Sequence, residues 1–143
     1  IHAPLTIPAL RWPTAMTFNP YRSEIYLYNE DRGGEIYVYN VVTGNWRVFA
    51  KKVGYSLVGL HFDKRSKNIL GPRYKSHKIS EIVKFDGQGK NLEPHPLPKP
   101  LDFSKNKWRV RLVKGESDLW LKISHPAEPG GELHPVFESG QKM

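Results

Sequence analysis

The apolar residues of this chain recur mostly at every second position, which is the pattern of β-strands that bury one face. Two similar runs, 24–28 and 35–39, flank the turn-rich sequence NEDRGG and predict an N-terminal β-hairpin. Residues 55–63 and 77–86 predict two further strands. Residues 108–134 predict two strands around a tight turn and then a third strand, so we expect a mainly antiparallel sheet.

The segment 45–53 follows a helical period instead. Its apolar residues Trp46, Phe49, Ala50 and Val53 are spaced as i, i+3, i+4 and i+7, which favours one short helix packed on the sheet. Together these elements predict an α+β fold, a twisted antiparallel sheet with one short helix and an N-terminal β-hairpin.

The length of 143 residues predicts one domain that spans residues 1–143. Residues 1–14 contain three prolines and are expected to form an extended arm. Residues 87–106 contain four prolines and predict a long loop, because proline cannot donate a backbone hydrogen bond. The first residue is Ile1 and not methionine, from which we expect that an upstream segment was removed.

A weak internal repeat indicates a different architecture. The sequence from Ala15 onward aligns with the sequence from Gly59 onward, at a spacing of about 44 residues. With its strands, a Thr-Gly turn and a tryptophan, the repeat resembles the blades of kelch-type propellers. Two or three blades cannot close a propeller, which needs at least about four, so this alternative is a propeller fragment.

Composition narrows the classes of function. The chain has no cysteine, which excludes disulfides and cysteine-based metal sites. No apolar run approaches the roughly 18 residues of a membrane-spanning helix. The formal net charge of +8 at pH 7 favours a polyanionic partner such as nucleic acid. Aromatic residues make up 12% of the chain and offer rings on which bases can stack.

Three residue types that cleave RNA without metal occur in order along the predicted strands. Such cleavage needs a base for the 2′-OH proton, an acid for the departing 5′ oxygen, and a cation that holds the phosphate. A carboxylate or a histidine can act as the base and a histidine as the acid, and arginine suits the cation because its planar fork pairs with two phosphate oxygens. A hairpin with the three-residue loop 115–117 would set Arg109 opposite Ile123, on the face shared with His125.

The sequences SEIVKF, WRVRL and LKISH, which contain Glu81, Arg109 and His125, resemble strands of the microbial ribonuclease superfamily. The resemblance implies that Glu81 is the base, that Arg109 holds the phosphate and that His125 is the acid. That superfamily includes barnase, guanyl-specific fungal ribonucleases and sarcin-type ribotoxins, and the segment HPAEPGGEL is similar to the ribotoxin segment after the catalytic histidine. The resemblance implies that Leu133 lines the site and that His61, in GLHF, is a further catalytic residue. We expect substrate contacts from Tyr55, Arg111 and Lys75 as well.

The implied function is a metal-independent, cofactor-free endoribonuclease that cleaves single-stranded RNA to a 2′,3′-cyclic phosphate by transphosphorylation. Only RNA supplies the 2′-OH that this reaction needs. The resemblance implies a microbial-ribonuclease-like fold and a basic, secreted, toxin-like protein that acts in a target cell. We expect RNA as the partner, with a host protein or a cognate inhibitor as further partners, no membrane contact, and a monomer.

Other interpretations stay open. Gly59 stands where the ribonuclease family usually has a tyrosine, which favours a catalytically inactive effector that binds RNA or a host protein. A kelch-like propeller fragment would bind protein or sugar, and a bacterial toxin module would come from a larger polypeptide. Among single residues, Glu81 has a structural alternative as the salt-bridge partner of Arg109 or Arg111, and His125 has one as a surface histidine.

Overall fold

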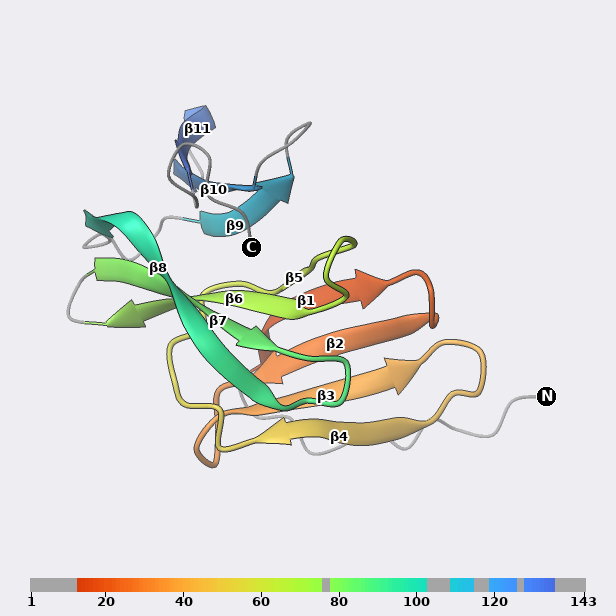
Figure 1. The fold of residues 1–143 in the computed structure, drawn as a ribbon. Coiled ribbons are helices and arrows are strands. Elements are labelled where there is room, and N and C mark those ends of the chain that lie inside the picture. Colours follow the sequence, from red (N-terminus) through yellow and green to blue (C-terminus); the bar gives the residue numbers. More distant parts are fainter. Residues whose placement is uncertain (1–12, 76–77, 103–108, 115–118, 126–127, 136–143) are drawn as a thin grey trace.

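The computed structural model describes residues 13–75, 78–102, 109–114, 119–125 and 128–135 of the chain. All regular structure in these residues is β-strand (Figure 1). The strands are β1 (Pro13–Asn19), β2 (Glu24–Asn29), β3 (Glu35–Asn40), β4 (Trp46–Lys51), β5 (His61–Phe62), β6 (Ile69–Lys75), β7 (Lys78–Phe85), β8 (Asn91–Asp102), β9 (Arg109–Lys114), β10 (Leu119–His125) and β11 (Glu128–Pro135). None of these elements is a helix that could cross a membrane.

Three antiparallel sheets follow one another along the chain. The first sheet has the order β1-β2-β3-β4, the middle sheet β5-β6-β7-β8, and the third sheet β11-β10-β9. Every strand pairs with the strand that precedes or follows it in sequence, so each sheet is an up-and-down meander. The predicted N-terminal hairpin is confirmed as β2 and β3, in which Tyr26 pairs with Val38.

The predicted helix at 45–53 is wrong, because these residues form β4 at the edge of the first sheet. Tyr37 pairs with Val48 and Ile36 pairs with Ala50, so Phe49 is the extra residue of a β-bulge. The bulge interrupts the alternation of faces, and β4 carries apolar residues on both faces. These two features together give the apolar residues of β4 the spacing of a helix. The predicted α+β class is therefore wrong, and the described residues form an all-β fold.

The predicted loop at 87–106 is also wrong over most of its length, because residues 91–102 form β8. Its prolines, Pro94, Pro96, Pro98 and Pro100, are all exposed and occupy alternate positions, whereas His95, Leu97 and Leu101 are buried. Because β8 is an edge strand, residues without an amide donor are tolerated there. The predicted arm at 1–14 lies outside the described residues up to residue 12.

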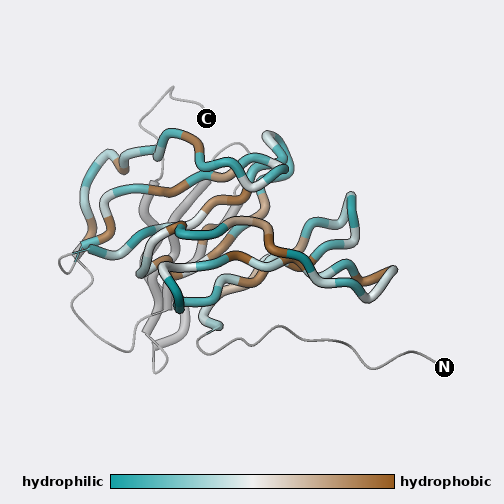
Figure 2. Tube along the Cα trace, turned by 90° about the horizontal axis from the view of Figure 1, so that it is seen from below, coloured by the Kyte–Doolittle hydropathy of each residue, from teal (hydrophilic) through white to brown (hydrophobic). Residues whose placement is uncertain are grey.

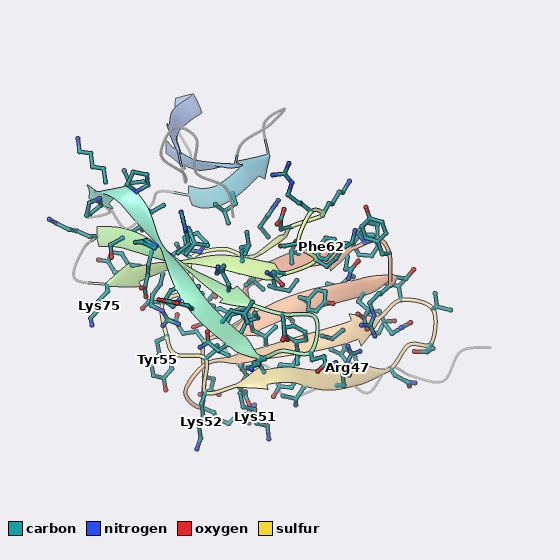
Figure 3. The ribbon with its side chains drawn as sticks, viewed as in Figure 1. Arg47, Lys51, Lys52, Tyr55, Phe62 and Lys75 are labelled. Carbon is teal, nitrogen blue, oxygen red and sulfur yellow. The ribbon has the colours of Figure 1, made fainter. Side chains whose placement is uncertain are left out.

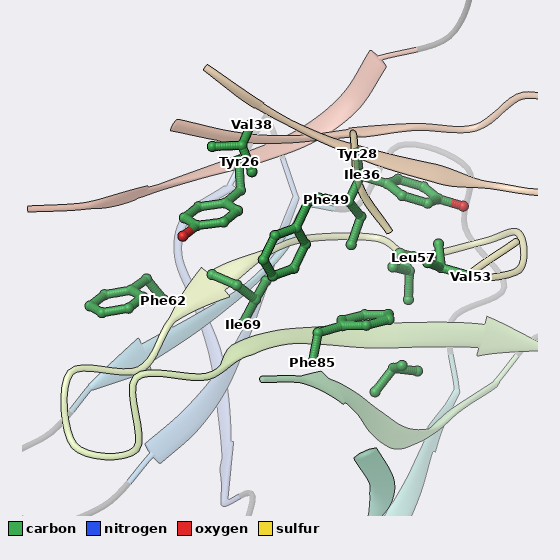
Figure 4. Close-up of a cluster of buried hydrophobic side chains, with 11 residues drawn as sticks. Tyr26, Tyr28, Ile36, Val38, Phe49, Val53, Leu57, Phe62, Ile69 and Phe85 are labelled. Carbon is green, nitrogen blue, oxygen red and sulfur yellow. The ribbon is translucent and has the colours of Figure 1, made fainter. Parts of the chain in front are cut away.

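The first and middle sheets pack face to face around one apolar core (Figure 4). Tyr26, Tyr28 and Phe49 come from the first sheet, and Ile69 and Phe85 come from the middle sheet. The rings of Tyr26 and Phe49 meet edge to face, with centroids 4.9 Å apart, which is a favourable aromatic geometry. Figure 2 shows the hydrophobic stretches along the strands and the hydrophilic ones at the turns.

The middle sheet is buried on both faces. Leu70 and Ile82 lie on the face turned away from the first sheet, yet neither is exposed to solvent. The third sheet approaches this face, since β6 and β9 are in contact and Leu112 of β9 is buried. The described sheets are therefore stacked in chain order, with the middle sheet between the other two.

A buried carboxylate joins strands at one end of the first sheet. The side chain of Glu24 is 2% exposed, and it pairs with Arg47 at 2.6 Å and with Arg22 at 3.2 Å. The hydroxyl of Tyr26 also donates a hydrogen bond to it. Burial by itself raises the pKa of Glu24, but these hydrogen bonds and positive charges outweigh burial and lower the pKa below its usual value.

We predict that Phe49→Ala destabilises the fold by about 3–5 kcal/mol, because it empties the centre of the core. Val48→Ala, at the neighbouring position, should change stability much less, because Val48 is 42% exposed. Urea unfolding of both variants measures the two free energies. Equal losses at the two positions would contradict the bulge that separates their environments.

We predict that Glu24 contributes to stability above its unfolded pKa and that this contribution is lost as pH falls through the lower folded pKa. Glu24→Gln should destabilise the protein by about 1.5–3 kcal/mol at neutral pH, because the hydrogen bonds to charge are lost. The difference between wild type and variant should shrink at acid pH. Urea unfolding at pH 7 and near pH 3 tests this, and a pH-independent difference would contradict it.

Candidate functional site

Three segments of the chain meet at one end of the stacked sheets, and we call the surface that they form the linker rim. It consists of the β2–β3 turn (30–34), the linker 52–60 between β4 and β5, and the end of β6. The amide of Gly33 donates to the hydroxyl of Tyr55 at 2.9 Å. The amide of Tyr74 donates to the carbonyl of Ser56 at 2.8 Å, so the linker touches both sheets.

Arg73 fastens the linker to the middle sheet. Its guanidinium donates to the carbonyl oxygens of Tyr55, at 2.6 Å, and of Val53. Gly54 lies between them with φ +91°, and a Cβ at that position would come within 2.5 Å of the guanidinium. Glycine is therefore required here both by the backbone conformation and by the close approach of Arg73.

The first sheet holds the same linker from the other side. The hydroxyl of Tyr28 donates to the carbonyl of Gly54 at 2.8 Å, and the amide of Ser56 donates to the carboxylate of Glu30. Burial, together with the charge of Glu30, raises the pKa of Tyr28 to about 12. The phenol therefore remains a hydrogen-bond donor at physiological pH.

The backbone of the rim is strained at several positions. Arg32, Lys52 and Ser56 have φ angles of 51°, 54° and 67°, in the left-handed region that side chains other than glycine seldom adopt. Such strain costs about 1–3 kcal/mol per residue and collects at functional sites. These backbone conformations have to be held in place by the contacts around them, which the linker rim receives from both sheets.

The exposed charged residues of the rim, Arg32, Lys52 and Lys75, are all basic, whereas its acidic residues Glu30 and Asp31 are half-buried. Elsewhere in the described chain, most acidic residues with described side chains also lie inward. Glu24 and Glu35 are buried in ion pairs, and Asp63 and Asp86 accept hydrogen bonds within their own turns. Glu93 is the one exposed acidic residue among those whose side chains the structure describes. The exposed basic residues there are Arg22, Arg32, Arg47, Lys51, Lys52, Lys64, Arg65, Lys67, Lys75, Lys78, Lys90 and Lys99.

Two of the predicted substrate contacts lie at the linker rim. Tyr55 is 53% exposed, and Lys75 is exposed at the end of β6. Figure 3 places both along the same edge of the molecule as Lys51 and Lys52. The sequence analysis missed Arg73, whose role depends on contacts with carbonyl groups far away in the sequence.

The structure does not bring His61 and Glu81 together. His61 pairs with Leu70, whereas Glu81 pairs with Arg73, three residues further along the same strand. Because faces alternate along β6, His61 shares a face with Leu70 and Glu81 lies on the opposite one. These two residues therefore cannot serve one catalytic site within the middle sheet.

The hairpin of β9 and β10 has a different register from the expected one. Lys114 pairs with Leu119, which closes a four-residue connection, and Arg109 pairs with Ser124 instead of Ile123. The register that would have placed Arg109 on the face of His125 is therefore absent. The side chains of Arg109 and His125 lie outside the described part of the structure.

The remaining predicted residues are placed by backbone pairing alone. Lys122 of β10 pairs with Arg111 of β9 on one side and with Leu133 of β11 on the other, so the three occupy one cross-strand row. Their roles in substrate contact stay predictions. Within the described residues, no group of histidines and carboxylates could hold a metal ion.

No protein-family model and no curated protein matches the sequence. Among solved structures, the chain is similar to a chain of the crystal structure of a nidogen/laminin complex, with a TM-score of 0.52 and 17% sequence identity. The match covers 88% of this chain and 51% of that chain, so this chain spans about half the length of its structural neighbour. At this identity the similarity concerns the fold, and that fold is not an α+β ribonuclease.

We predict that Arg73→Lys loosens the linker, because an ammonium group cannot hold two carbonyl oxygens as the planar guanidinium does. The amides of Val53 and Gly54, which donate to the β2–β3 turn, should exchange with solvent faster. The loss of stability should be about 1 kcal/mol. Amide hydrogen exchange measures the effect, Lys75→Arg serves as the control, and unchanged protection of both amides would contradict the role of Arg73.

Proposed function

We propose that this chain forms consecutive blades of a β-propeller-like array and acts as a protein-binding module. The observation that carries the proposal is the face-to-face stacking of two four-stranded meanders in chain order, followed by a third sheet. The first strands of the two meanders, β1 and β5, are in contact, as expected for blades that radiate from a common centre.

The internal repeat supports this architecture. Its copies start at Ala15 and Gly59, 44 residues apart, and each copy covers one of the two four-stranded meanders. A repeat of this length is typical of propeller blades with four strands. The strand β4, which replaces the predicted helix, supplies the fourth strand that a blade requires.

Two observations support a protein partner. The structural neighbour comes from a complex of two proteins, nidogen and laminin, which favours the same class of activity for this fold. The linker rim offers a rigid surface built from connections, and such connections on a rigid scaffold commonly carry binding residues. Because the exposed charged residues of this rim, Arg32, Lys52 and Lys75, are basic, we propose an acidic protein surface as the partner.

The fold and the placement of the expected catalytic residues do not support RNA cleavage. The ribonuclease resemblance implied an α+β fold, whereas the described residues form sheets alone. Of the expected catalytic group, His61 and Glu81 lie on opposite faces of the middle sheet. A binding module accounts for the basic surface without a catalytic group.

We predict that a fluorescent poly-glutamate peptide binds the linker rim. Lys51→Glu combined with Lys52→Glu should weaken binding roughly tenfold at low salt, because Lys52 lies at the rim and Lys51 directly precedes it at the end of β4. The control combines Lys64→Glu with Arg65→Glu in the β5–β6 turn, at the other end of the sheets. The two double variants carry the same net charge. A difference in their affinity for the peptide, measured by fluorescence anisotropy, therefore reports where on the protein the peptide binds.

Equal weakening by the two double variants would show that net charge, and not the rim, attracts the peptide. Incubation of the wild-type protein with single-stranded RNA tests whether the protein is a binding module or a ribonuclease. Cleavage of RNA without metal by the wild-type protein would overturn the assignment as a binding module.

A further inference from the structure

Among the described strands, β4 has a partner on one side alone, because it pairs with β3 at the border of the first sheet. The amide of Asn40 in β3 donates to the carbonyl of Asn45 at 2.9 Å, so Asn45 directs its backbone polar groups toward β3. These groups alternate in direction along an antiparallel strand. Arg47 therefore also faces β3, whereas Trp46 and Val48 direct their amides and carbonyls away from the sheet.

The other borders of the first and middle sheets are closed to a further strand. β1 lies in contact with β5, and the amide of Phe62 in β5 donates to the hydroxyl of Thr17 in β1 at 2.9 Å. β8 has proline at alternate positions, and proline has no amide donor. Within the described parts of these two sheets, β4 is therefore the border that keeps both donors and acceptors for a strand from another protein.

The available stretch is short and leads to positive charge. The β7–β8 turn meets β4 at the bulge, where Gly89 lies against the carbonyl of Phe49. An added strand can thus pair with residues 46–48, before the bulge. Lys51 and Lys52 follow the bulge and are both exposed, so this border becomes basic where β4 leads into the linker rim.

We propose that the partner of this chain docks an extended acidic segment on β4 and adds it as a further strand to the first sheet. The unpaired amides and carbonyls of Trp46 and Val48 call for a polypeptide backbone, which a nucleic acid lacks. The charges of Lys51 and Lys52 call for acidic side chains on that segment.

The proposed array of blades leaves this border free. In such an array β1 and β5 lie toward the common centre, so β4, the last strand of its meander, lies at the outer periphery. Neighbouring blades cover the faces of a sheet and not its outer border. The inference rests on the proposed function and adds to it that the acidic partner contributes a strand, and not side chains alone.

A fluorescent peptide in which glutamate and valine alternate tests the proposal with the wild-type protein at low salt. Its control is the same peptide with N-methyl groups on the backbone amides of its central residues, which keeps every charge. Fluorescence anisotropy should show at least about tenfold weaker binding of the methylated peptide, because it cannot donate hydrogen bonds to the carbonyls of β4. Lys51→Glu combined with Lys52→Glu should weaken binding of the unmodified peptide as well.

Amide hydrogen exchange locates the added strand. With the unmodified peptide bound, the amides of Trp46 and Val48 should exchange at least about fivefold more slowly than in the free protein. The amide of Arg47 is the internal control and should change little, because it faces β3. Both measurements use the wild-type protein, so neither depends on the folding of a variant.

The outcomes separate this inference from the proposed function. Equal binding of both peptides would overturn the added strand and leave an acidic partner of the linker rim in place. Binding of neither peptide would overturn both proposals. Slow exchange at Trp46 and Val48 in the free protein would show that the border is already occupied and would overturn the inference, as would peptide-induced protection that is absent from β4.

Discussion

Face-to-face packing of the first and middle sheets is the interaction on which the rest of the structure depends. The core between them consists of large rings and branched side chains, and it fixes the distance between the two sheets. The linker from β4 to β5 must cross that distance, and Val53 and Leu57 anchor it in the same core. The linker rim and its basic residues owe their arrangement to this packing.

The linker is held more strongly than a plain connection requires. Arg73 of the middle sheet and Tyr28 of the first sheet both donate hydrogen bonds to it, so the conformation of the linker depends on both sheets. Both groups donate to backbone carbonyls, which leaves the exposed lysines of the rim free of this structural task. A backbone held by hydrogen bonds from both sheets, with exposed charged side chains on it, suits a surface that recognises charge.

Sequence patterns predicted the hairpin of β2 and β3 and the strand β7, because in both the alternation is regular and turn residues mark the ends. They give no strand at β6, which contains Gly71 and Pro72. In the structure, Gly71 lets the carbonyl of Gly59 approach closely, and the carbonyl of Pro72 accepts a hydrogen bond from Val58. These long-range contacts, like those of Arg73, leave no periodic signal in the sequence.

The alternating prolines of β8 have a consequence for how copies of this protein can meet. An exposed strand at the border of a sheet ordinarily offers its amides to a strand of another molecule, and such ribbons grow into aggregates. Pro94, Pro96, Pro98 and Pro100 remove amide donors along this border, so no strand can extend the middle sheet there. The middle sheet is thereby protected, at the edge formed by β8, from pairing with strands of other molecules.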